Sequence, residues 1–192
     1  MRAGIVWCAG SFAYLAVEAV AAAAFRPRYS YIDNFVSDLG VPGLASPLAW
    51  LMNVGFFVNG VLFLAGAVAL RKTGPFFSLA AMNALGNVLI AFFHSGSAVH
   101  AVGAVLAIVG GNAAILAGSS IIGGVHHKVS IGLGLFGLLS FALFVFDLKS
   151  GTLPRGVVER CSVYSITVWQ LLTAATILTR RPTAWPCRAR RA

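Results

Sequence analysis

The side chains best suited to chemistry lie close to the ends of the apolar segments of this chain. A hydroxyl group near an imidazole can act as a nucleophile with its base, and a positioned carboxylate can act as a general acid or base. These residue types predict one polar site at one end of the apolar segments. Its candidate catalytic residues are Ser37, Asp38, His100, Glu159 and Arg160.

Metal binding is a second function that these residue types could serve, because imidazole and carboxylate groups are common metal ligands. The candidate ligands are His94, His100 and Asp38. Zinc would need three or four such groups at about 2.0–2.2 Å from one point, which the spacing does not impose. The sequence has no H-E-x-x-H, G-x-S-x-G or phosphate-loop motif. The cofactor is therefore unknown, and haem ligation by the two histidines is a weaker alternative.

The composition indicates that these residues are positioned by an integral membrane protein. Of the 192 residues, 59% are hydrophobic and 10% are charged, whereas soluble proteins carry about 25% charged residues. A soluble fold of this size would lack the polar surface to cover so much apolar material. The composition excludes a soluble enzyme domain, a disordered tail and a disulfide-rich secreted module.

Six apolar segments are long enough to cross a bilayer, which takes about 20 residues of helix. A signal peptide is the alternative for the first segment, but its apolar run is too long and contains Glu18. We therefore expect a retained helix there. The six predicted spans are Gly4–Ala24, Pro47–Leu70, Pro75–Phe93, Val99–Ile122, Val129–Phe146 and Val157–Thr179.

The predicted fold is all-α, with six transmembrane helices in one bundle over residues 1–180 and a basic cytoplasmic tail over 181–192. The fourth span has small residues at four-residue steps, including Gly103, Ala107 and Gly111. Small residues let membrane helices approach closely, which favours a central position for this span. Cys8, Cys161 and Cys187 are expected to be free thiols.

The distribution of basic residues predicts the orientation in the membrane, because cytoplasmic loops are enriched in lysine and arginine. With both termini in the cytoplasm, nine of the 14 basic residues lie inside and five outside. The high Ala, Gly and Arg content suggests a GC-rich bacterium, and hence its cytoplasmic membrane. The positive charge then reflects topology and contact with lipid headgroups, and we expect no nucleic-acid partner.

This orientation gathers all five acidic residues at the outer side, together with His94 and His100. Glu18 lies within a span, where an ionisable group costs at least about 2.5–3.5 kcal/mol and needs a partner. Arg26, Arg160 or a histidine could provide that partner. Asn83 and Asn87 continue the polar stripe of His94 into the membrane on one helical face.

The first outer loop is expected to contain a short amphipathic helix in the membrane interface. Ser30 and Asp33 resemble a capping box, and apolar residues follow at helical spacing up to Leu39. Gly40 can end such a helix. Its polar side would present Ser37 and Asp38 to the mouth of the bundle.

Several motifs resemble domain-of-unknown-function family 998. They are Arg26-Pro27-Arg28-Tyr29-Ser30, Val36-Ser37-Asp38-Leu39-Gly40, Val99-His100-Ala101-Val102-Gly103-Ala104 and Gly156-Val157-Val158-Glu159-Arg160, with Trp169 in the last span. The resemblance covers nearly the whole chain and implies a six-helix membrane fold. It implies no particular reaction.

Two functional classes remain open. The first is a non-catalytic protein that binds lipids or assembles with a membrane-protein partner through an outer polar site. The second is a membrane-embedded hydrolase or transferase acting on a lipid or lipid-linked substrate in the outer leaflet. The enzyme requires at least three side chains of one set to converge on a single cavity. That set is Asp38, His94, His100, Asp147 and Glu159. A channel or transporter is a third and weaker alternative.

Overall fold

The computed structural model describes residues 1–43, 45–71, 73–148 and 150–179, and these residues form six long helices and two short 3-10 helices. The long helices are α1 (Arg2–Ala24), α2 (Ala49–Ala69), α3 (Pro75–Phe92), α4 (Ala98–Ala117), α5 (Gly124–Asp147) and α6 (Arg155–Thr179). The short ones are η1 (Val36–Gly40) and η2 (Ser119–Ile121).

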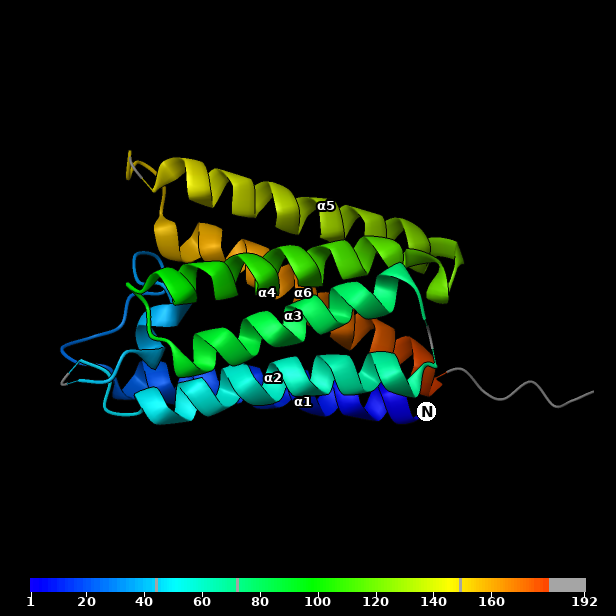
Figure 1. Ribbon diagram of the computed structural model, residues 1–192, viewed down its shortest axis with the longest axis horizontal. Coiled ribbons are helices and arrows are strands. Elements are labelled where there is room, and N and C mark those ends of the chain that lie inside the picture. The colour runs from blue at the N-terminus through cyan, green and yellow to red at the C-terminus, as the bar shows by residue number, and fades with distance from the viewer. Residues whose placement is uncertain (44, 72, 149, 180–192) are drawn as a thin grey trace, which may run out of the picture.

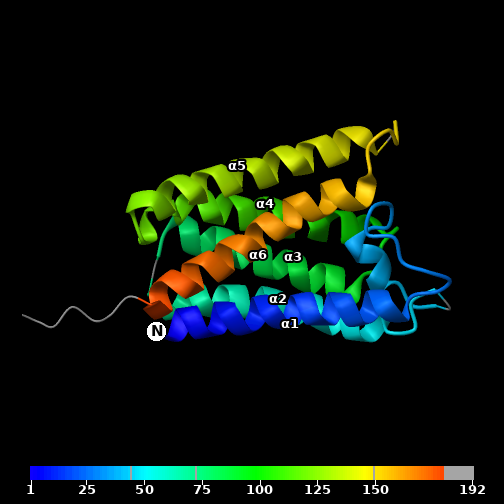
Figure 2. The same ribbon diagram turned by 180° about the vertical axis from the view of Figure 1, so that it is seen from behind.

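The six long helices run along the long axis of one bundle (Figure 1). All six are long and apolar enough to cross a membrane. The loops after α1, α3 and α5 lie at one end, together with η1, and we call this the η1 end. The N-terminus and the loops after α2 and α4 lie at the opposite, N-terminal end. Seen from behind, α6 crosses one face of the bundle between α1 and α5 (Figure 2).

Close packing of small residues holds α4 against α3. A methyl group placed on Gly86 of α3 would collide with the backbone of Ala107 and Gly103 of α4. In lipid, the hydrophobic effect does not drive apolar helices together. Close backbone contact of this kind is therefore a main source of attraction between them. It agrees with the central position predicted for the fourth span.

Aromatic side chains fill the core at the N-terminal end. Trp7, Phe63, Phe76 and Trp169 are buried and contact one another. Each indole group has a hydrogen-bond acceptor, because Trp7 Nε1 donates to the Phe63 carbonyl at 3.0 Å and Trp169 Nε1 donates to Ser130 Oγ at 2.9 Å. The buried charged residues, Glu18, Asp147, Glu159 and Arg160, lie instead toward the η1 end.

The predicted six-helix fold is confirmed, with shifted boundaries. The fifth helix begins at Gly124 instead of Val129, and the fourth ends at Ala117 before η2. Cys8 and Cys161 are free thiols. The predicted tail over 181–192, including Cys187, lies outside the described residues.

The expected amphipathic interfacial helix has a different form. Ser30 and Asp33 do interact, with the Asp33 N–H donating to Ser30 Oγ at 3.2 Å, but they close a turn. The helical segment is the 3-10 helix η1, and its Val36 and Leu39 are buried in the bundle. The segment therefore caps the bundle instead of lying on its surface.

Candidate functional site

Arg160 joins the first loop to the helices at the η1 end. Its Nε donates to Glu18 Oε1 at 3.0 Å, in an ion pair whose side chains are 7% and 2% exposed. Its Nη1 group donates at 3.0 Å to the carbonyl oxygens of Tyr31, Asn34 and Gly156. The guanidinium therefore connects α1, α6 and the loop before η1, and Glu18 has one of the partners expected from the sequence.

Two tyrosines complete this ion pair. Tyr164 donates its hydroxyl to Glu18 Oε2 at 2.8 Å. The Tyr29 hydroxyl accepts from Arg160 Nη2 and donates to the Phe35 carbonyl at 2.8 Å. Burial raises the pKa of the Tyr29 phenol above its ordinary value, while the charge of Arg160 acts in the opposite direction. Tyr29 therefore stays neutral and keeps its donor for the loop.

Two acidic side chains hold η1 in place. Asp38 Oδ2 accepts from the backbone N–H of Phe35 at 2.9 Å, which caps the segment from within. Glu159, which lies on α6, accepts from the N–H of Val36 through Oε2 at 2.5 Å. The first N–H groups of a helix have no partner inside the helix, so the side-chain oxygens of these two acids satisfy donors that burial would leave unpaired.

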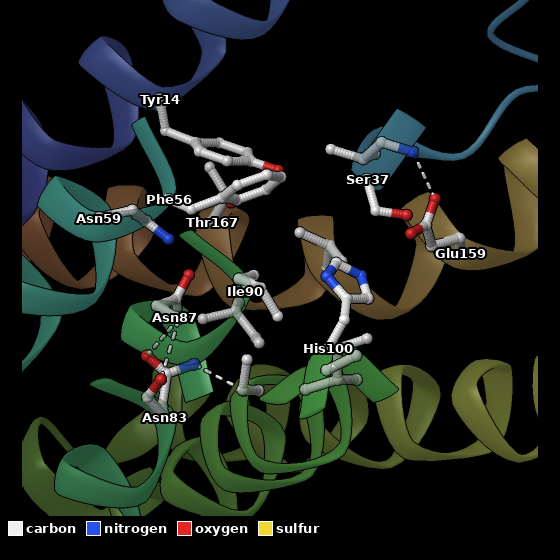
Figure 3. A pocket seen from close by; sticks show the side chains of 16 residues that line it. Tyr14, Ser37, Phe56, Asn59, Asn83, Asn87, Ile90, His100, Glu159 and Thr167 are labelled. Atoms are coloured by element: carbon white, nitrogen blue, oxygen red, sulfur yellow. Dashed lines mark hydrogen bonds between the residues drawn. The ribbon is translucent and has the colours of Figure 1, made fainter. Parts of the chain in front are cut away.

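A central chamber of about 50 Å³ lies beneath η1 (Figure 3). Its lining polar side chains are Tyr14, Ser37, Asn59, Asn83, Asn87, His100, Glu159 and Thr167. Ser37, His100 and Glu159 lie toward one end and the asparagines toward the other. This volume is far below the roughly 300–1,000 Å³ of pockets that hold organic ligands. The chamber is of a size for a few water molecules.

His100 presents an unprotonated nitrogen in its neutral form. Its Nδ1 lies 2.8 Å from the carbonyl oxygen of Phe93. A carbonyl oxygen only accepts hydrogen bonds, so Nδ1 carries the hydrogen and Nε2 keeps its lone pair. Ser97 caps α4 through its Oγ, which accepts from the N–H of His100 at 3.1 Å. The imidazole is thus oriented as a base.

The other residues predicted for the site lie elsewhere. His94 is exposed. Asp147 accepts from the hydroxyls of Ser150 and Thr152, at 2.8 Å each, and so organises the loop after α5. Among the described residues, no three His, Cys, Asp or Glu side chains are grouped to hold a metal ion. Of the five candidate catalytic residues, Ser37, His100 and Glu159 line the chamber, while Asp38 and Arg160 fix the surrounding backbone.

Sequence reasoning did not single out Tyr14 or Tyr164 of this site. Tyr14 lies four residues before Glu18, and therefore on the same face of α1. That spacing was the available signal for Tyr14. Tyr164 likewise lies four residues after Arg160. Tyr29 belongs to one of the family motifs, but its contact with Arg160 depends on the path of the loop.

Two grooves lie near the η1 end, an apolar one between α5 and α6 and one of mixed polarity beside α1. The α5–α6 groove has a volume of about 410 Å³ and includes Phe136, Cys161, Val168 and Arg160 in its lining. The α1 groove has about 350 Å³ and runs along the alanines of α1 up to Arg28. Tyr31 lines both grooves, with its ring centroid 4.8 Å from the guanidinium carbon of Arg160. Tyr31 thus separates two grooves of ligand size.

The fold and these contacts define a multi-pass membrane protein with a polar site at one end of its bundle. The chain matches the family described as "Protein of unknown function (DUF998)" over residues 8–176 and therefore belongs to it. The resemblance seen in the sequence motifs is confirmed. No curated protein and no solved structure gives a significant match to the chain.

Proposed function

We propose that this protein binds a phospholipid in the membrane leaflet at its η1 end. The observation that carries the proposal is the α5–α6 groove, which is apolar, of ligand size, and placed on the face that a bilayer would surround. Pockets of about 300–1,000 Å³ accommodate organic ligands. Under the predicted orientation, the lipid belongs to the outer leaflet.

The apolar lining selects an acyl chain as the occupant of the α5–α6 groove. Phe136, Val157 and Val168 line it and are 40–50% exposed in the protein alone. The α1 groove, on the other side of Tyr31, has a similar size and is apolar along the alanines of α1 but polar toward Arg28. Two acyl chains of one phospholipid would fit this arrangement, with Tyr31 between them.

The charge at the mouth of the grooves favours an anionic headgroup. Arg26 and Arg28 are exposed on the loop after α1, and Arg28 lines the α1 groove. Among the described residues, neither side chain has an ion-pair partner. Basic residues near a membrane surface attract anionic lipids with about 1 kcal/mol each.

The enzyme alternative has less support. At least three residues of the set of five must converge, but only His100 and Glu159 line the chamber, whereas Asp38, His94 and Asp147 do not. The chamber is too small for a lipid, and Glu159 is engaged with η1. Lipid binding accounts for the grooves without a reaction.

Native mass spectrometry of protein extracted from vesicles of phosphatidylglycerol and phosphatidylcholine tests the proposal. Val168→Trp fills the α5–α6 groove, and Val54→Trp is its control, because Val54 is similarly exposed on α2 but lines neither groove. We expect the wild type and Val54→Trp to retain a phospholipid that Val168→Trp loses. Equal retention by the two variants would contradict the proposal.

The headgroup preference needs a separate comparison. Arg28→Gln should reduce the preference for phosphatidylglycerol, because it removes the cation at the groove mouth. Arg155→Gln is the matched control, since Arg155 is also exposed at the η1 end but does not line the grooves. An unchanged preference in Arg28→Gln would remove the headgroup part of the proposal.

A further inference from the structure

Glu159 places a carboxyl group inside the bundle and forms no ion pair with another described residue. The residue is 8% exposed and lines the central chamber. Its Oε2 accepts from the Val36 N–H, and its hydrogen bonds to the described residues include no guanidinium. Figure 3 shows the carboxyl group beside Ser37 at the edge of the chamber.

The charges around Glu159 disfavour ionisation of its carboxyl group. Arg160 follows it in sequence, but its guanidinium is paired with Glu18 and directed to loop carbonyls. Asp38 of η1 adds a further negative charge nearby. The other titratable groups facing the region are Tyr14 of α1, Tyr29 of the loop, His100 of α4 and Tyr164 of α6. An unpaired charge buried in a bilayer is unfavourable, so a neutral carboxyl group fits this position.

The chamber also requires water. The hydroxyl of Tyr14 and Oδ1 of Asn59 are buried, and neither has a hydrogen-bond partner among the described residues; both residues line the chamber. Buried polar atoms of this kind are normally satisfied by ordered water. A water molecule needs roughly 10–15 Å³ of such space, and the chamber offers about 50 Å³.

We propose that the central chamber is a hydrated proton-binding site, in which Glu159 holds a proton that exchanges through water with His100. In the transfer, the O–H bond of the Glu159 carboxyl breaks and a water molecule accepts the proton. That water gives a proton to Nε2 of His100, where an N–H bond forms. A neutral acid and a neutral imidazole thereby become a carboxylate and an imidazolium, with no change in total charge.

The position of His100 connects this site to the surface. His100 is partly exposed near the start of α4, at the η1 end, and also lines the chamber. It can therefore exchange protons with both the chamber and the solvent. The proposal is independent of lipid binding, because the grooves and the chamber share no lining residue.

Infrared difference spectroscopy of the full chain in lipid nanodiscs tests the proposal. The C=O stretch of a protonated carboxylic acid is separate from carboxylate bands. We expect such a band at neutral pH, with a shift in D₂O that reports exchange. Glu159→Gln should lose the band and keep the Val36 contact through its amide oxygen. Asp33→Asn, which removes an exposed carboxyl group at the same end, should keep it.

His100→Gln separates a proton-exchange role from mere burial of a neutral acid. We expect the Glu159 band to remain in this variant but to shift more slowly in D₂O. The absence of a carboxylic acid band from the wild-type protein at neutral pH would overturn the proposal. A band that survives Glu159→Gln would overturn it too. An exchange rate unchanged by His100→Gln would remove His100 from the pathway.

Discussion

Arg160 and Glu18 lie 142 positions apart in sequence and form an ion pair of 3.0 Å between the last helix and the first. The same guanidinium holds the carbonyls of Tyr31 and Asn34. One side chain therefore closes the bundle and fixes the loop that leads to η1. Tyr31, whose carbonyl oxygen accepts from this guanidinium, lines both grooves.

Loss of Arg160 should destabilise the protein strongly. Arg160→Gln leaves Glu18 buried without its counter-charge, and breaking such a pair costs about 3–5 kcal/mol. Arg155→Gln makes the same chemical change on an exposed residue one turn earlier and should change stability by less than about 0.5 kcal/mol. Denaturant unfolding in bicelles, followed by tryptophan fluorescence, measures both. Similar losses would show that the pair does not close the bundle.

A methyl group at Gly156 should displace the loop. The Gly156 N–H donates to the Ile32 carbonyl at 2.9 Å, and an added Cβ would lie 2.5–2.9 Å from the carbonyl oxygens of Asn34, Tyr31 and Ile32. Gly156→Ala should therefore lower stability and increase proteolysis of the loop. At Gly132 of α5 the same change meets no atom within 4 Å. Gly132→Ala should be neutral or stabilising by up to about 1 kcal/mol, and equal behaviour would refute the docking role.

Tyr29→Phe should cost about 1–3 kcal/mol, because it leaves a buried donor of Arg160 and the Phe35 carbonyl without their partner. Tyr31→Phe is the control, since the Tyr31 hydroxyl makes no hydrogen bond to the described residues and the residue is 45% exposed. Thermal unfolding of the two variants provides the comparison. A larger loss for Tyr31→Phe would contradict this role for the Tyr29 hydroxyl.

Burial also makes the contribution of Tyr29 depend on pH. Its pKa is raised in the folded protein, while an unfolded tyrosine ionises at about pH 10. The stability that this group contributes is therefore present below about pH 10 and lost as the pH rises further toward the folded pKa. Tyr29→Phe should show a shallower loss of stability above pH 10 than the wild type. Parallel curves would contradict this linkage.

The predicted orientation puts the η1 end outside the cell. Asp33→Cys and Lys128→Cys, each made without the native cysteines, place exposed thiols at the two ends of the bundle. A membrane-impermeant maleimide should label Asp33→Cys on intact cells and Lys128→Cys only after permeabilisation. The reverse labelling pattern would contradict the predicted orientation and assign the bound lipid to the inner leaflet. The proposal that the grooves bind a lipid would remain.

Hydropathy was sufficient to predict the six helices, because each span needs about 20 apolar residues. It also placed Glu18, His100 and Glu159 at one end, since successive spans alternate in direction. The sequence did not show which of the ionisable side chains at that end pair with one another. Glu18 had several possible partners, and only the packing of α1 against α6 selects Arg160.

The form of η1 could not be read from its apolar spacing. The pattern up to Leu39 favours an amphipathic α-helix, but Glu159, 123 positions away from Val36, accepts the first N–H of the segment. Asp38, within the segment, accepts a hydrogen bond from the N–H of Phe35. These contacts draw Val36 and Leu39 into the bundle as a tight 3-10 turn. A contact of such sequence separation leaves no local signal.

Photolabelling tests lipid binding most directly. A phosphatidylglycerol with a diazirine in its acyl chain is added to proteoliposomes of the wild type, and the labelled peptides are mapped after illumination. The account predicts excess labelling of the α5–α6 groove, at Phe136, Cys161 and Val168, over the equally lipid-facing Val54 and Phe57 of α2. Even labelling of both surfaces would contradict a specific lipid site.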